Sequence, residues 1–172
     1  MNHPQFNPAL EEHRRKTIVL NEKIRYAYPD FCACIDFMLY TGIRPSELWL
    51  LDEMELTMSG DLKFQPNKNN DFRIIKNTMA LHVFNTKYAN IHRFISIRSI
   101  QDLSRLFSKY FGHGIDFDHG KETILYIFRY MYINHLILEG YSKEKIRLAM
   151  GHRHIENTEK YLISISAAKY KE

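Results

Sequence analysis

The sequence predicts a mainly α-helical domain of the α+β class with one small antiparallel β-sheet. Apolar residues recur at helical spacing, or in long runs, over residues 31–40, 99–111 and 122–138. Two short apolar segments flank a turn-forming stretch at residues 66–71. With 172 residues, of which 45% are hydrophobic, the chain fits a single domain with a substantial core.

The first half of the chain predicts two helices after a polar start. Residues 1–16 are expected to form a loose lead-in. The apolar run at residues 31–40 predicts a helix that stops near Gly42, because glycine commonly ends helices. Pro45 suits the first position of a helix over residues 45–51, since the amide hydrogen that proline lacks needs no partner there.

The middle of the chain predicts the sheet. Residues 61–65 and 72–75 read as two strands joined by the polar turn at residues 66–71. Residues 94–97 are a candidate third strand. The expected sheet is therefore small and antiparallel.

The last third predicts helices again. Residues 99–111 show helical periodicity, and the apolar stretch 122–138 is expected to be the buried central helix. Residues 143–150 predict a further helix, and Asn157 is a candidate cap for a last short helix that carries Tyr161.

Composition narrows the class of protein. A formal charge of +4 and a pI near 9.0 permit a polyanionic partner without proving one. Cys32 and Cys34 lie in an apolar run, which indicates small buried thiols rather than a metal site or a disulfide framework. No segment approaches the ~18 apolar residues of a membrane span, and the polar start is unlike a secretory signal. A cytoplasmic protein without membrane contact is expected.

Five short motifs follow one another along the chain. They are residues 41–48 (TGIRPSEL) with Arg44, Lys68 in the polar turn, residues 126–129 (YIFR) with Tyr126 and Arg129, Gly151 with His152, and Tyr161 nine positions after His152. In this order and spacing they resemble the catalytic motifs of the tyrosine recombinases, the family of phage integrases and Xer-type enzymes. Each motif alone is a weak signal, whereas five in order are a strong one.

The resemblance implies a recombinase catalytic-domain fold and transfer of a DNA phosphodiester. Arg44 and Arg129 would clamp the nonbridging oxygens with paired donors, and His152 would donate a further hydrogen bond to them. Lys68 would act as general acid on the departing 5′-oxygen. Tyr161 would attack phosphorus and remain joined to the 3′-phosphate. A tyrosine hydroxyl, with its ordinary pKa near 10, needs such cations to react at neutral pH.

One motif departs from the family pattern. Tyr126 stands where the family has a histidine, so it can hydrogen-bond a phosphate but cannot bring a positive charge. Slower or more substrate-restricted chemistry is one consequence, and Tyr126 is equally compatible with a place in the core. Lys76 and Lys87 are weaker rivals of Lys68 for the general acid.

Structural alternatives stand beside the other assignments. Arg129 interrupts an apolar helix and is explained by a bound anion or by a buried salt bridge. Glu47 is expected to support the Arg44 turn or an arginine. A metal site built on His152 and His154 lacks spaced acidic or thiol ligands. The alternative for Tyr161 is a place in the hydrophobic core. Its spacing of nine positions from His152 in the sequence argues against that alternative.

The resemblance also sets expectations for partners. Because one phosphodiester replaces another, neither a nucleotide, a metal nor another cofactor is required, and no small-molecule substrate is expected. The partner is double-stranded DNA, on which the full-length enzyme would form a homo-tetramer. We interpret the chain as a catalytic domain without the family's N-terminal core-binding domain, either excised, which we favour, or a short natural form. The resemblance implies that residues 162–172 are a tail that packs on a neighbouring protomer. The rival functions are a type IB topoisomerase or telomere resolvase, and a non-catalytic DNA-binding module of the same fold.

Overall fold

The computed structural model describes residues 3–66, 71–112, 115–116 and 122–170. Its helices are α1 (Pro8–Ile24), α2 (Pro29–Thr41), α3 (Thr78–Ile97), α4 (Ile100–Phe111), α5 (Ile127–Leu138), α6 (Lys143–Ala149) and α7 (Ile155–Ala167), with the 3-10 helices η1 (Pro45–Glu53) and η2 (Ile124–Tyr126). Its strands are β1 (Glu55–Leu56), β2 (Leu62–Phe64), β3 (Arg73–Ile75), β4 (Ile115–Asp116) and β5 (Lys169–Tyr170). The predicted α+β class, mainly helical with a small antiparallel sheet, is confirmed.

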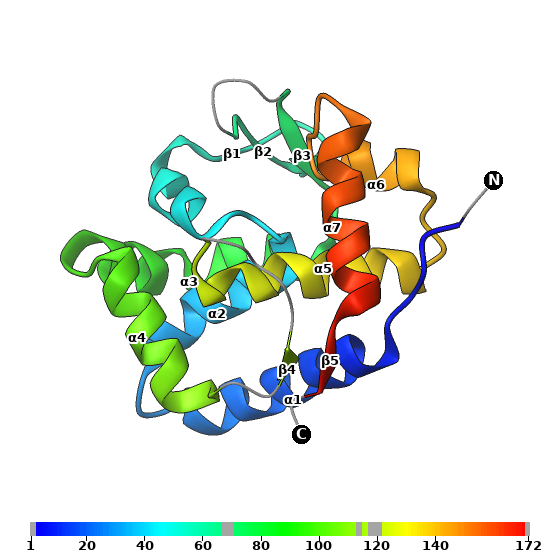
Figure 1. Ribbon diagram of the computed structural model, residues 1–172. Coiled ribbons are helices and arrows are strands. Elements are labelled where there is room, and N and C mark those ends of the chain that lie inside the picture. The colour runs from blue at the N-terminus through cyan, green and yellow to red at the C-terminus, as the bar shows by residue number, and fades with distance from the viewer. Residues whose placement is uncertain (1–2, 67–70, 113–114, 117–121, 171–172) are drawn as a thin grey trace.

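Two buried helices form the centre of the molecule. Helix α2 packs against α1, α3 and α5, and α5 in turn contacts α1, α6 and α7 (Figure 1). Both helices are apolar around most of their circumference, as expected for a fully enclosed helix. Cys32 and Cys34 are free thiols in this core, as predicted. Helix α5 carries one formally charged residue, Arg129, and its burial needs an explanation.

The small sheet lies beside α6, at the top of Figure 1. Its strands run antiparallel in the order β1-β2-β3, with Lys63 of β2 opposite Ile74 of β3. The predicted strands at 61–65 and 72–75 are confirmed. The predicted strand at 94–97 is wrong, because this segment is the end of α3: Ile91 and Phe94 are buried at helical spacing.

The start of the chain was also predicted wrongly. Residues 1–16 were expected to be a loose lead-in, but Pro8 begins α1 and the side chain of Asn7 caps it by accepting from the Leu10 amide. Polar composition hid this helix, because it buries only a few residues against α2 and α5, among them Leu10 and Asn21.

Three of the predicted helices differ from the structure in their bounds or in their type. The stretch 122–138 divides into η2 and α5, since the Thr123 side chain accepts from the Leu125 amide and starts a tighter turn. The segment 45–51 is helical but of the 3-10 type. The last helix begins two residues before the predicted cap Asn157, and it extends through most of the predicted tail.

None of the helices within the described ranges has the length and apolar character of a membrane span.

Candidate active site

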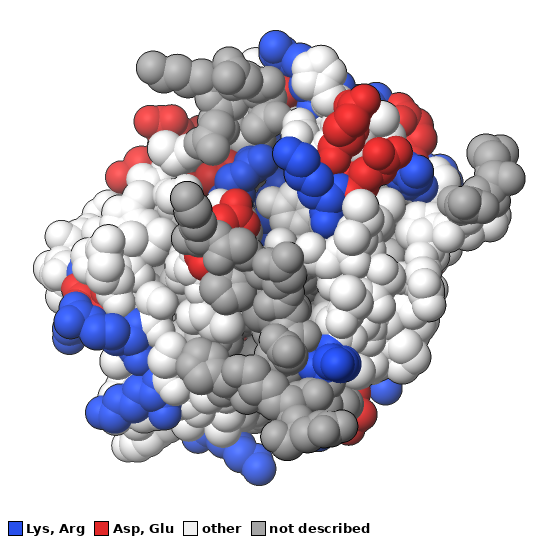
Figure 2. Space-filling view, in the orientation of Figure 1, with Lys and Arg blue, Asp and Glu red and all other residues white. Residues whose placement is uncertain are grey.

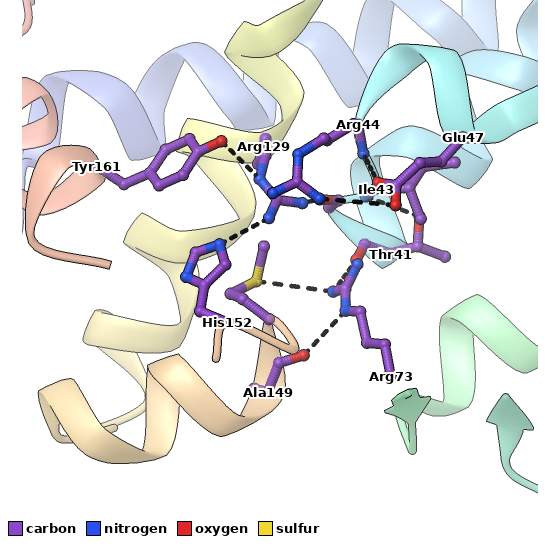
Figure 3. A network of polar contacts seen from close by, with 11 residues as sticks. Thr41, Ile43, Arg44, Glu47, Arg73, Arg129, Ala149, His152 and Tyr161 are labelled. Carbon is purple, nitrogen blue, oxygen red and sulfur yellow. Dashed lines mark hydrogen bonds and ion pairs between the residues drawn. The ribbon is translucent and has the colours of Figure 1, made fainter. Parts of the chain in front are cut away.

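Four of the six predicted site residues meet in one place. Arg44 at the entrance of η1, Arg129 on α5, His152 in the loop after α6 and Tyr161 on α7 form a polar cluster (Figure 3). Lys68 lies outside the described residues, so its role stays a prediction.

Arg129 is the centre of the cluster. Its side chain is buried, and it donates from Nη1 to the Gly42 carbonyl at 2.7 Å and from Nε to the Tyr161 hydroxyl at 3.0 Å. Its Nη2 lies 2.9 Å from Nε2 of His152. None of the ion pairs within the described residues involves Arg129. Neutral groups rather than a carboxylate therefore hold this charge, so its electrostatic attraction for an anion is not cancelled.

His152 is enclosed by cations. Burial lowers its pKa to about 3, and the guanidinium groups of Arg129, Arg44, Arg73 and Arg147 lower it in the same direction. The ring is therefore neutral at physiological pH. Both ring nitrogens already have protein partners within 3 Å, which leaves neither for a metal ion.

Tyr161 presents its hydroxyl to Arg129 rather than to the core. Its ring stacks on the His152 ring with centroids 5.6 Å apart and planes inclined by 11°. The Arg129 guanidinium carbon also lies 5.1 Å from the Tyr161 ring centroid. The half-buried ring is fixed by these contacts and by Tyr130, while the oxygen is held at the cationic cluster.

Arg44 is oriented by Glu47, as predicted. One oxygen of the buried Glu47 carboxylate accepts from the Arg44 amide at 2.6 Å, and the other lies 3.7 Å from Arg44 Nη1. This contact closes the first turn of η1 and holds the Arg44 side chain beside Arg129 (Figure 3). The arginine keeps further N–H groups available for an anion.

Tyr126 lies at the edge of the same cluster. Burial and the nearby Glu122 and Tyr161 raise its pKa to about 12, while Arg44 and Arg129 act in the opposite direction. Its hydroxyl is therefore protonated and can donate a hydrogen bond, but it brings no charge to the site.

The two rival lysines lie elsewhere. Lys76 borders a cavity of about 630 Å³ together with Tyr40 and His135. Lys87 borders a different cavity, beside Glu22. Neither cavity is lined by Arg44, Arg129, His152 or Tyr161. The cluster is thus the only one of these places where the predicted residues gather.

Arg73, which the resemblance also places as a basic residue five positions after Lys68, is a buried link next to the cluster. It is buried, donates from Nε to the Ala149 carbonyl at 2.9 Å, and donates from Nη2 to the Thr41 carbonyl. Burial lowers its pKa to about 10, so it stays charged. Arg73 thereby ties β3 to the loop that carries Arg44 and to the end of α6, which precedes His152. Strand alternation could have indicated that Arg73 is buried, because Arg73 and Ile75 lie on the same face of β3.

The face shown in Figure 2 carries both basic and acidic groups. In Figure 2, Lys and Arg atoms border a recess in the upper half of this face, with Asp and Glu atoms on either side of it.

Comparison with protein-family models, curated proteins and solved structures finds no significant match. The geometry of the cluster is therefore the basis for a functional conclusion.

Proposed function

We propose that this chain is a DNA strand transferase of the tyrosine-recombinase type, which cuts and rejoins DNA through a tyrosyl phosphodiester. The observation that carries the proposal is the position of the Tyr161 hydroxyl, 3.0 Å from Arg129 Nε, a buried guanidinium group that has no carboxylate partner among the described residues. A hydroxyl beside an anion site is the arrangement that attack on a phosphodiester requires.

The proposed reaction uses each group according to its chemistry. Arg44 and Arg129 hold the two nonbridging oxygens of the scissile phosphate and stabilise the charge that builds up on them. The Tyr161 hydroxyl gives up its proton to solvent as its oxygen forms a bond to phosphorus and the bond to the 5′-oxygen breaks. Lys68 delivers a proton to that leaving oxygen, and Tyr126 donates a neutral hydrogen bond. The 3′-phosphotyrosyl bond retains the energy needed for rejoining.

Recombination and the related topoisomerase or resolvase reactions share this first step. They differ in their products, which are joined heterologous sites, relaxed circles or hairpin ends. The partner in each case is double-stranded DNA, and assembly of a longer form into a tetramer belongs to the recombination proposal. A DNA-binding module of the same fold would make none of these products.

Trapping of the covalent intermediate tests the proposal. A pool of nicked duplexes with randomised sequence releases a short strand on cleavage, so the protein–DNA adduct accumulates and is seen as a shifted band in a denaturing gel. We expect the adduct with the wild-type chain and none with Tyr161→Phe, because the phenyl ring lacks the nucleophilic oxygen.

Tyr26→Phe is the matched control, since Tyr26 is almost fully exposed and far from the cluster in sequence. It should form the adduct like the wild type. Adduct formation by Tyr161→Phe would contradict the assignment of the nucleophile, and DNA binding without any adduct would favour the non-catalytic module.

A further inference from the structure

The neighbours of the His152 ring determine where its hydrogen lies. An arginine side chain can only donate hydrogen bonds, so His152 Nε2, 2.9 Å from Arg129 Nη2, is the acceptor and carries no hydrogen. The neutral ring must then carry its hydrogen on Nδ1. That atom lies 2.9 Å from Oγ1 of Thr158, which accepts it. The lowered pKa of His152 agrees with a neutral ring.

Thr158 is placed to control this arrangement. It is completely buried on α7, and it precedes Tyr161 by three residues, about one helical turn. One hydrogen-bonded chain therefore runs from the Thr158 hydroxyl through His152 to Arg129, and from Arg129 Nε to the Tyr161 hydroxyl. This row of hydrogen bonds begins at Thr158 and ends at Tyr161, both on α7. It therefore fixes the position of Tyr161 relative to His152.

We propose that Thr158 is a positioning residue: by accepting from Nδ1–H it holds the His152 ring, whose tautomer Arg129 sets, and so aims the Arg129 guanidinium at the Tyr161 hydroxyl. The opposite tautomer would point an Nε2–H at a guanidinium N–H and would separate the two groups. His152 thus has a role besides the one expected from the sequence: in the free protein it accepts from Arg129 instead of donating to a phosphate. The catalytic consequence rests on the proposed function, whereas the tautomer does not.

Nitrogen NMR of the histidine rings tests the tautomer without DNA. The chain has nine histidines, and His152→Gln identifies the signals of His152 by their disappearance. In the wild type we expect a protonated Nδ1 and an unprotonated Nε2. Thr158→Ser keeps the hydroxyl and should keep this pattern and the position of the Nδ1–H signal. Thr158→Val keeps the shape but removes the acceptor, so the Nδ1–H signal should shift while Nε2 stays unprotonated.

Two results would overturn the proposal. One is a protonated Nε2 in the wild type, which needs no variant and therefore decides the matter even if Thr158→Val fails to fold. The other is an unshifted Nδ1–H signal in a folded Thr158→Val protein, checked by circular dichroism.

The adduct assay gives the consequence for catalysis. We expect Thr158→Val to form the adduct roughly 10- to 100-fold more slowly, as for a misaligned reacting group, with Thr158→Ser near the wild-type rate. A wild-type rate in Thr158→Val would contradict the positioning role. Failure of the wild type to form any adduct would contradict the proposed function instead, and the NMR result would still decide the tautomer.

Discussion

At the scale of single residues, two buried guanidinium groups in and beside the site are held by neutral partners. Arg129 donates to a carbonyl, a hydroxyl and an imidazole, and Arg73 donates to two carbonyls. Carbonyl, hydroxyl and imidazole dipoles accept from these N–H groups without neutralising the positive charge. The local potential therefore stays positive, as an anion site requires. Keeping His152 neutral is one consequence, because a further positive charge would be repelled.

The neutral His152 makes stability depend on pH. Its pKa is about 3 in the folded protein against an ordinary value of 6.5, so below about pH 6.5 the unfolded chain takes up a proton that the folded chain refuses. Stability should fall as the pH drops from about 6.5 towards 3, by up to ~1.4 kcal/mol per pH unit from this residue. Urea denaturation between pH 7 and pH 4 measures it.

The comparison uses two variants. His152→Gln should remove this part of the pH dependence, and His82→Gln, at an exposed position on α3, should leave it unchanged. Equal slopes for His152→Gln and the wild type would show that His152 does not control acid stability.

At the scale of elements, the site depends on how α2, η1 and α5 meet. Gly42 ends α2 with φ of 61°, and its carbonyl accepts from Arg129. The Gly42 backbone passes so close to α5 that a Cβ atom would lie 2.4 Å from the Tyr132 ring. The glycine is therefore required twice, for its left-handed backbone and for the approach of two helices.

Gly42→Ala should therefore be strongly destabilising. Left-handed backbone strain and overpacking against Tyr132 together are expected to lower the free energy of unfolding by roughly 2–5 kcal/mol. Gly60→Ala is the matched control: φ is 84°, but nothing lies within 4 Å of the added atom. Its loss should be limited to about 1–2 kcal/mol. Equal urea midpoints for the two variants would refute the close-approach argument.

At the scale of the whole molecule, the two ends of the chain are tied together at α5. The Asn7 side chain donates to the carbonyls of Ile165 and Ala168 at 2.7 Å each. Asn134 of α5 bonds the backbone of Asn7 at 2.8 and 2.9 Å. Ile165 is fully buried in the same protomer, so the predicted tail, residues 162–172, does not project as a free arm over its described part.

Asn7→Ala tests the importance of this tie. The substitution removes the donor to two carbonyl groups at the end of α7, and it removes the acceptor that caps the start of α1. Together these losses should lower the free energy of unfolding by an amount on the order of 2–4 kcal/mol. Hydrogen exchange should show faster opening of α7, the helix that carries Tyr161. Asn85→Ala, at an exposed position on α3, should change stability by less than ~0.5 kcal/mol. Similar values for both would mean that the Asn7 side chain contributes little to holding the ends together.

The sequence by itself determined the mainly helical class, the two strands around the turn, and the choice of Arg44, Arg129, His152 and Tyr161, which the fold brings together. The helical class and the strands depend on local periodicity and on turn-forming residues, which lie within short windows, whereas the four site residues were chosen by the resemblance of their motifs to those of the tyrosine recombinases. Lys68, in the part of the turn that is not described, remains a prediction from the sequence.

Only the tertiary structure decided the polar helix α1, the end of α3, and the roles of Arg73, Thr158 and Asn7. Each of these side chains acts through partners that lie far away in the chain or on another element: Arg73 on Thr41 and Ala149, Thr158 on His152, and Asn7 on Asn134 and Ile165. The physical reason is that a buried polar group is stabilised by whichever partner folding brings within hydrogen-bonding distance, and no local pattern specifies that partner.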